Sequence, residues 1–259
     1  MSAGSPRLSA PRLSALVVAR DEERQLADCL GTLRFAEEIV VVLDRCTDGS
    51  KAIAERLAHK VIEGGWEIEG ARRNAGLAAC TGDWILEVDA DERVPPALAE
   101  EIRGAVRAAS APAHYLVPFD NYIGKRLVRH GWGGSWGVAA TTRLFSRGAK
   151  RWGDQRIHPA VELAGEKRWL ETPMIHYVDA SISDMLRRLD RYSSARARDM
   201  RANGTKETFG RNLRRLFTRF FKCYVRRKGY KEGYWGFLVA LMAALWPMLA
   251  WLKYKLEDE

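Results

Sequence analysis

Residues 81–92 have the sequence Thr-Gly-Asp-Trp-Ile-Leu-Glu-Val-Asp-Ala-Asp-Glu, a short apolar run with an acidic end. The segment 83–88 predicts a buried strand, and Asp89 and Asp91 follow it at once. Alternate side chains of an extended chain point to the same side, so these carboxylates are expected about 6–7 Å apart on one side. Such a pair suits Mg²⁺ or Mn²⁺, which proteins hold with one or two carboxylates plus substrate phosphates. The alternative is a solvated acidic turn that caps the next helix.

Strand and helix patterns alternate through the rest of the first hundred residues. Buried strands are predicted at Leu13–Ala19, at 38–43 and, in a short form, at Val61 and Ile62. Helices are predicted at 22–33, at 48–58 with Asp48 as N-cap, at Glu69–Ala79, and from Pro95 to Ala109. This order predicts an α/β fold with a mostly parallel central sheet and helices on both faces. Ligands of such sheets bind beyond the carboxyl ends of the strands, which favours a functional role for the acidic end of 81–92.

Other polar residues are expected at the same edge of the sheet. Residues 20–23 (RDEE) follow the first strand, 44–50 (DRCTDGS) follow the second, and 70–76 (GARRNAG) precede the fourth. Asp44 is a candidate for hydrogen bonding a base or ribose. Arg72 or Arg73 is a candidate for contacting phosphate oxygens, because a guanidinium matches them bidentately.

The composition excludes several classes of protein. Hydrophobic residues make up 47% and charged residues 29%, so the chain is neither disordered nor collagen-like. The net charge of +9 indicates a partner with phosphates, such as nucleic acid, an anionic membrane or a charged substrate. Residues 187–259 hold 18 Lys and Arg and 7 Asp and Glu, so the excess lies in the tail, which argues against a uniformly basic nucleic-acid binder. The four cysteines show neither CxxC nor zinc spacing, and no signal peptide is recognised, which together predict a reducing compartment.

The tail carries two membrane signals. Residues 211–228 predict a basic helix, which favours an in-plane position on an anionic bilayer; the alternative is a docked helix whose charges face water. Its apolar stripe comprises Leu213, Leu216, Phe217, Phe220, Phe221, Tyr224 and Val225. Residues 234–252 hold no charge and as a helix would span about 28 Å, close to the roughly 30 Å hydrocarbon core. A monotopic attachment and a single transmembrane span are both open, because Gly236 and Pro247 weaken a simple span. Either places the body at the cytoplasmic face of the inner (plasma) membrane.

The segments 13–23 (LSALVVARDEE), 38–50 (EIVVVLDRCTDGS) and 70–92 (GARRNAGLAACTGDWILEVDADE) together resemble the family 2 glycosyltransferases. The resemblance implies the nucleotide-binding α/β fold called GT-A and its Asp-x-Asp metal motif. Weaker motifs further along, together with the tail, resemble the lipopolysaccharide core β-glucosyltransferase branch; they are 122–125 (YIGK), His130 to Trp132, Arg143 to Phe145, His158 and His176.

The resemblance implies a metal-dependent, inverting transfer of a sugar from a nucleotide-sugar, a UDP-hexose such as UDP-glucose, to a lipid-linked glycan such as the lipopolysaccharide inner core. Divalent Mg²⁺ or Mn²⁺ is expected on Asp91, Asp89 and His176. Contacts to the nucleotide-sugar are expected at Ala19, Arg20, Glu22, Asp44, Arg73, Asp89, Ala90 and Trp132. The chain departs from the family where relatives often have His-Glu, because it has His158-Pro159 there, so a base carried over from that Glu has no counterpart.

Three residues beyond the acidic motif are candidates for the catalytic base: Asp154, His158 and Glu162, with Asp154 favoured because its loop is rich in Gly and polar residues. His158 or His176 is a candidate for a further metal ligand, and Trp132 for stacking on a sugar, although a buried Trp is the commoner case. The predicted organisation is a disordered leader at 1–12, a catalytic domain at 13–180 with a nucleotide-binding half (13–112) and an acceptor half (113–180), and a helical tail at 181–259. Within 113–180, weak strands at 113–122, 139–145 and 169–175 predict an antiparallel extension.

Two other functions remain open from the residues alone. A nucleotidyltransferase also presents paired Asp side chains to a metal and a nucleotide. A non-catalytic binder of membrane or nucleic acid would use the basic tail. The preferred hypothesis needs no nucleic acid, and the oligomeric state is not predicted.

Overall fold

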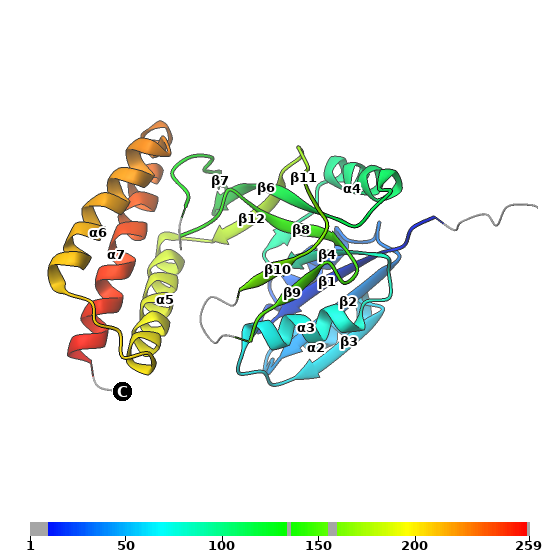
Figure 1. Cartoon of the computed structure of the whole chain (residues 1–259), viewed down its shortest axis with the longest axis horizontal. Coiled ribbons are helices and arrows are strands. Elements are labelled where there is room, and N and C mark those ends of the chain that lie inside the picture. The colour runs from blue at the N-terminus through cyan, green and yellow to red at the C-terminus, as the bar shows by residue number, and fades with distance from the viewer. Residues whose placement is uncertain (1–9, 134–135, 155–159, 258–259) are drawn as a thin grey trace, which may run out of the picture. The chain divides into compact units, whose positions relative to one another are not determined.

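The structure is a computed structural model that describes residues 10–133, 136–154 and 160–257. The chain divides into two compact units (Figure 1). The first, here called the sheet unit, comprises Met1–Pro118 and Ala140–Met174. The second, here called the helical unit, comprises Phe119–Ala139 and Ile175–Glu259. Of the predicted leader, residues 1–9 lie outside the described residues.

Four parallel strands form the centre of the sheet unit, as predicted. They lie in the order β3-β2-β1-β4, and their bounds are Lys60–Gly64, Glu38–Asp44, Leu13–Ala19 and Trp84–Asp89. Every residue of β1 and β2 is buried, because a parallel sheet is covered on both faces, and most of these residues are therefore apolar. The α/β class with a mostly parallel central sheet is confirmed.

Antiparallel strands extend the sheet beyond β4. Strand β8 (Ala140–Ser146) pairs with β4, and β6 (Ala113–Ile123) pairs with β8, both antiparallel. The predicted strand at 169–175 is wrong: β11 (Glu166–Trp169) runs parallel to β6, and β12 (Met174–Asp179) begins after a break. Pro173 lies in that break, where its missing N–H cannot serve a ladder. Short strands complete the set: β5 (Glu92–Arg93), β7 (Arg126–Leu127), β9 (Lys150–Trp152) and β10 (Val161–Leu163).

The helices of the sheet unit are α1 (Leu26–Gly31), α2 (Ser50–Leu57), α3 (Glu69–Ala79) and α4 (Pro96–Ala108). Helix α3 has the predicted bounds, and α4 is one residue shorter than predicted at each end. Helices α1 and α2 are shorter than predicted because the preceding residues are tied into loops. The Glu22 N–H donates to Ser50 Oγ (2.9 Å). Asp48 accepts from the Ser50 N–H (3.0 Å), but it precedes the N-cap of α2, which is Gly49.

Gly76 sets how closely α3 lies on the sheet. A Cβ at this position would lie 2.5 Å from Leu16 Cδ1 and 2.9 Å from Val42 Cγ2, so only glycine permits this approach. Helix α3 therefore packs against β1 and β2, which fixes its first turns at the carboxyl edge of the sheet (Figure 1).

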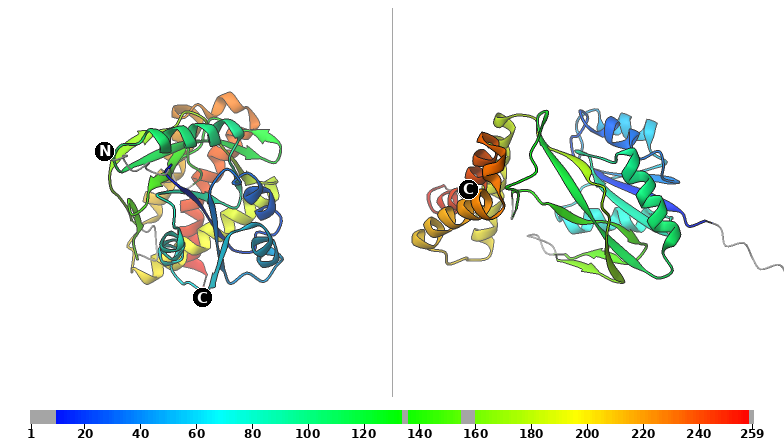
Figure 2. Two further views of the ribbon diagram at one scale, coloured as in Figure 1. Left: turned by 90° about the vertical axis from the view of Figure 1, so that its right-hand side faces the viewer. Right: turned by 90° about the horizontal axis from the view of Figure 1, so that it is seen from above.

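Three long helices dominate the helical unit: α5 (Ile182–Ala202), α6 (Phe209–Phe221) and α7 (Tyr234–Leu256). They lie side by side in Figures 1 and 2, and α7 packs against both others. A π-helical turn (Lys222–Arg226) and a 3-10 turn (Gly229–Glu232) join α6 to α7. The predicted helical tail is confirmed as helix. Its core includes side chains from the middle of the chain, namely Ile123, Val128, Trp132 and Trp136.

Candidate active site

The acidic end of β4 is folded into a tight turn. The strand ends at Asp89, Ala90 and Asp91 form a turn, and β5 begins at Glu92. The Asp89 N–H donates to Glu92 Oε2 at 2.9 Å, which closes the turn. The expected extended segment is therefore wrong: the chain turns between Asp89 and Asp91, so strand alternation does not determine where their carboxylates lie.

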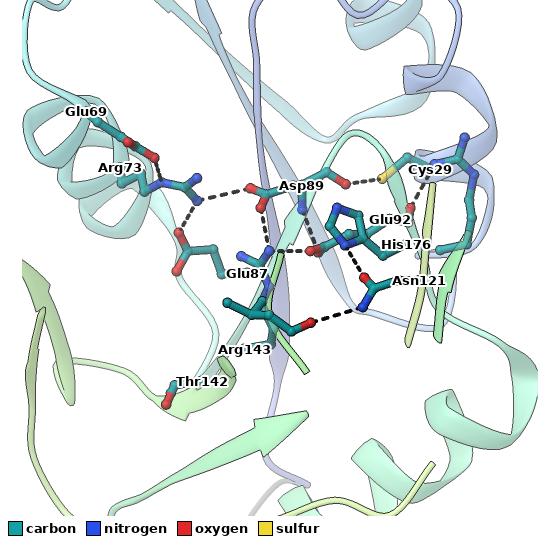
Figure 3. Close-up of polar contacts among 12 residues, drawn as sticks. Cys29, Glu69, Arg73, Glu87, Asp89, Glu92, Asn121, Thr142, Arg143 and His176 are labelled. Carbon is teal, nitrogen blue, oxygen red and sulfur yellow. Dashed lines mark hydrogen bonds and ion pairs between the residues drawn. The ribbon is translucent and has the colours of Figure 1, made fainter. Parts of the chain in front are cut away.

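Two guanidinium groups hold the Asp89 carboxylate (Figure 3). Arg73 lies 3.1 Å from Oδ1, and Arg143 contacts Oδ2 and also the buried Glu92. Burial would lower the pKa of Arg143, but the charges of Asp89, Glu92 and Glu87 outweigh it and raise that pKa. Arg143 is thus a permanent cation that fixes the carboxylates at both ends of the turn.

Beneath Asp89 lies a buried ionic network centred on Glu87. This glutamate of β4 is fully buried, and it contacts Arg73 at 2.6 Å and also Lys150. Burial would raise the pKa of Glu87, but the charges of Lys150, Arg73 and Arg143 lower it below its ordinary value. Glu87 is therefore an ionised group that holds two cations under the strand end, and one of them, Arg73, reaches on to Asp89.

Trp152 links this network to the segment that follows β9. Its ring lies under Arg73 (4.9 Å) and Lys150 (4.8 Å), both at cation–π distance. Asn74 of α3 donates to the Trp152 carbonyl (2.7 Å) and accepts from its N–H (3.0 Å). The next residue, Gly153, approaches the start of α3 so closely that a Cβ on Gly70 would lie 2.1 Å from its carbonyl oxygen.

Asp44, at the carboxyl end of β2, is buried and accepts several hydrogen bonds. Its donors are Arg45 Nε (3.0 Å), the Trp66 N–H (3.1 Å) and Arg72 (3.2 Å). Burial would raise the pKa of Asp44, but these hydrogen bonds and the charges of Arg72 and Arg45 lower it. Arg72 Nε is buried and has no hydrogen-bond partner among the described residues, so this site retains an unused donor.

The loop after β1 brings together three predicted nucleotide-sugar contacts, Ala19, Arg20 and Glu22. Ala19 is buried at the strand end, Arg20 is exposed and Glu22 is half-buried. Asp21 between them adopts φ 54°, and its carboxylate accepts from the Thr47 N–H at 2.7 Å. The loops that follow β1 and β2 are therefore joined at the predicted edge.

The three base candidates differ in environment. Asp154 is exposed and directly follows Gly153, so it lies beside the start of α3. Glu162 is exposed on β10, opposite Arg151 in the β9–β10 pair. His158 lies outside the described residues. The sheet unit thus brings Asp154 toward the helix that carries Arg72 and Arg73, whereas Glu162 lies on a surface hairpin.

Two predicted site residues belong to the helical unit. Trp132 is buried in its core, and the indole N–H donates to the Val128 carbonyl, which favours packing over stacking on a sugar. His176 Nδ1 lies 2.8 Å from Asn121 Oδ1, while the Asn121 amide donates to the Val138 carbonyl. Because Asn121 Oδ1 is an acceptor, this contact favours the tautomer with the proton on Nδ1, which is one of the two tautomers that can ligate a metal.

Sequence reasoning missed the roles of Glu87, Glu92 and Lys150, and it named Arg143 only as part of a motif. A signal was present for two of them: Glu87 interrupts the apolar run of β4, and Arg143 is the single charge of β8. Charges in such places are rarely buried unless they are paired.

Charged side chains gathered at the carboxyl end of a central strand are the arrangement of a ligand-binding α/β enzyme. The family described as "Glycosyl transferase family 2" matches residues 14–149, a little over half of the chain, and the chain belongs to that family. The chain is thus a glycosyltransferase, and the nucleotidyltransferase and the non-catalytic binder are set aside.

Two relatives with glycosyltransferase names cover almost the whole chain. An uncharacterized glycosyltransferase of Rickettsia felis is 26% identical over 94% of this chain and 89% of its own length. The lipopolysaccharide core biosynthesis glycosyltransferase LpsC of Rhizobium meliloti is 25% identical over 93% of this chain and 91% of its own length. Among solved structures, a mannosyltransferase of Pyrobaculum calidifontis in complex with GDP-Man and Mn²⁺ covers 99% of this chain and 90% of its own, with 15% identity and a TM-score of 0.49.

Proposed function

We propose that this glycosyltransferase transfers a sugar from a nucleotide-sugar, a UDP-hexose such as UDP-glucose, to a lipid-linked glycan such as the lipopolysaccharide inner core, with inversion. The similarity to LpsC, which extends over almost the whole of both chains, supports the choice of acceptor. The observation that carries the proposal is the set of ion pairs made by Asp89. One of its carboxylate oxygens contacts Arg73 and the other contacts Arg143, and a second acidic residue, Asp91, lies in the same turn.

The donor set suits Mg²⁺ or Mn²⁺. Asp91 is half-buried in the turn and offers carboxylate oxygens, the ligands that both ions prefer. Asp89 and Asp91 are both candidate ligands, and Asp89, whose charge is shared with two guanidinium groups, also orients the turn. His176 remains a predicted ligand, since its contact with Asn121 is compatible with ligation by a neutral imidazole. When bound, the cation offsets the charge that builds on the departing diphosphate.

The nucleotide is proposed to bind along the carboxyl edge of the sheet. Asp44 is ionised and accepts from N–H groups, as hydrogen bonding to a base or ribose requires. The unused Nε donor of Arg72 suits a carbonyl of the base or a phosphate oxygen. Ala19, Arg20, Glu22 and Ala90, from the loop after β1 and the turn after β4, complete the proposed donor site.

Asp154 is the proposed general base, with Glu162 and His158 as the other candidates. It is an exposed carboxylate on a short segment anchored by Asn74 and Trp152, so it can accept a proton from the acceptor hydroxyl as the sugar bond forms. The bond between the sugar and the diphosphate breaks as the new glycosidic bond forms, and the nucleoside diphosphate leaves.

A lipid-linked acceptor places the enzyme at a membrane, and we propose a peripheral or monotopic position on the cytoplasmic face of the inner membrane. Among the described residues one helix, α7, is long and apolar enough to cross a bilayer by length and composition. However, 56% of its most apolar window is already buried inside the structure, which favours monotopic attachment over a span.

The proposal is tested by melting the purified chain with UDP-, GDP- and CMP-sugars in the presence of Mn²⁺, because a bound ligand raises the melting temperature. The expected result is a shift with the UDP-sugar that needs the metal and is lost in Asp91→Asn. Asp83→Asn, at the opposite end of β4, is the matched control and keeps the shift. Release of UDP on addition of lipopolysaccharide core acceptor is expected to fall about 100-fold or more in Asp91→Asn. A full metal-dependent shift in that variant would refute the assignment of Asp91.

A further inference from the structure

Helix α6 has two apolar faces, and only one of them is used inside the helical unit. Phe220 and Tyr224 pack inward, and the ring of Phe237 on α7 lies 5.5 and 6.1 Å from theirs. The other face is exposed. Phe217 and Phe221 are 64% and 54% exposed. They belong to a row of exposed apolar residues at four-residue spacing, which comprises Leu213, Phe217, Phe221 and Val225. We call these four residues the α6 outer row.

The charge around the α6 outer row has a single sign. From Phe209 to Lys231 the sequence holds nine Lys and Arg and no Asp or Glu. Three of these cations make contacts inside the unit: Arg215 pairs with Glu207 (2.6 Å), Arg219 lies 5.3 Å from the Trp246 ring, and Arg227 donates to Cys223 Sγ (3.6 Å). The exposed cations that flank the row include Arg211, Arg214, Lys222 and Arg226.

Helix α7 does not offer a comparable surface. Its apolar side chains fill the core of the helical unit, among them Val239, Ala240, Ala243 and Ala244. Its last turns are held by polar contacts, because the Trp251 indole N–H donates to the Glu207 carbonyl (3.0 Å) and Lys253 binds Asp190 (2.5 Å). A transmembrane position of α7 would break these contacts and uncover the core, so the most apolar segment is not the one available to lipid.

We propose that the α6 outer row inserts into the interface of an anionic phospholipid bilayer, with α6 lying parallel to the membrane plane. An apolar row with aromatic residues, bordered by cations and free of acidic side chains, complements the acyl boundary and the anionic headgroups together. The inference rests on the proposed function, to which it adds the surface that brings the enzyme to a lipid-linked acceptor. It revises the predicted stripe, because three of the predicted stripe residues, Leu216, Phe220 and Tyr224, are half-buried in the structure.

The test is sedimentation of the full chain with vesicles of phosphatidylcholine, with or without phosphatidylglycerol, in the absence of donor and acceptor. Binding is expected only with phosphatidylglycerol and is expected to weaken as salt is raised. Phe217→Ser and Phe221→Ser should each weaken it about tenfold, because each removes a large apolar side chain from the interface. Arg214→Glu and Lys222→Glu should each weaken it by at least about fivefold.

Leu186→Ser is the matched control, since Leu186 is 50% exposed on α5 and lies outside the α6 outer row. It should bind vesicles as the unchanged chain does. Phe217→Leu should also bind, and an unchanged melting temperature in every variant shows that the fold is intact. Point variants are preferred to truncation, because removal of α7 would uncover Trp132 and Trp136.

Unchanged vesicle binding in the Phe217→Ser, Phe221→Ser double variant would overturn the proposal, as would equal loss in the Leu186→Ser control. If the α6 outer row instead contacts a second copy of the chain or a nucleic acid, the unchanged chain should not bind vesicles. Donor-dependent release of UDP in detergent is measured separately. Failure of vesicle binding therefore leaves the proposed sugar transfer intact, and failure of UDP release leaves the membrane surface intact.

Discussion

Replacing Lys150 by Met should destabilise the sheet unit more than a typical substitution does. Lys150 is buried, contacts the fully buried Glu87 and donates to the Thr142 carbonyl at 3.1 Å. Without the lysine, Glu87 keeps its contact with Arg73 but loses one of the three cations that stabilise its buried negative charge. Removing one partner of a buried ion pair costs about 3–5 kcal/mol. For a unit of this size that lowers the melting temperature by about 6–20 °C.

The effect is measured by urea and thermal unfolding, followed by tryptophan fluorescence and circular dichroism. The double variant Glu87→Gln with Lys150→Met is the companion, since it removes the buried negative charge together with its partner. It should be more stable than Lys150→Met alone. A cost below about 1 kcal/mol for Lys150→Met, or a double variant as unstable as the sum of the single ones, would refute the role given to the Glu87 charge.

The pH dependence gives a second check. The folded-state pKa of Glu87 lies below its ordinary value of 4.5, so its contribution to stability is complete above that value and is lost as the pH falls through the lower, folded-state pKa. In Lys150→Met the pKa of Glu87 should rise. The difference in the free energy of unfolding between the unchanged chain and the variant should therefore be largest at pH 7 and should decrease below pH 4.5. A difference that stays constant down to low pH would show that lost packing is the cause.

Further predictions concern packing and thiol chemistry. Gly76→Ala should cost about 1–3 kcal/mol in the free energy of unfolding, because its Cβ would collide with the sheet. Gly104→Ala, in the middle of α4 with open space around it, should stabilise by up to about 1 kcal/mol; equal effects in urea unfolding would contradict this reasoning. Cys46, which is half-buried, should react with a thiol reagent in the native protein before Cys80, whose pKa burial raises to about 12. Faster labelling of Cys80, located by mass spectrometry, would contradict the described burial.

Much of the fold follows from local patterns in the sequence. The continuous apolar runs of β1 and β2 identify buried parallel strands, and Pro95-Pro96 mark the start of α4. The starts of α1 and α2 could not be predicted, because they depend on hydrogen bonds between loops about 25 residues apart, such as Gly49 to Glu23. Local propensity carries no information on such contacts.

The candidate site was predictable in position but not in detail. The motif around Asp89 and Asp91 follows from a strand that ends in acidic residues. The turn that separates them depends on Glu92 and on Arg143, which lies 54 residues beyond Asp89 in the sequence. A pairing over that distance requires the antiparallel addition of β8 to β4, and the sequence offers only weak strand signals for it.

The helical unit joins residues that are far apart in the order of synthesis. Glu232 accepts from the Arg129 N–H, 103 residues earlier in the chain, and Trp132 packs among side chains of α7. At ribosomal rates of about 5–20 residues per second, residue 129 is made about 5–20 s before its partner. The central segment must therefore wait, with its tryptophans uncovered, until translation is almost complete. During that interval the nascent chain exposes apolar surface that a chaperone would recognise, and synthesis of this enzyme should depend on one.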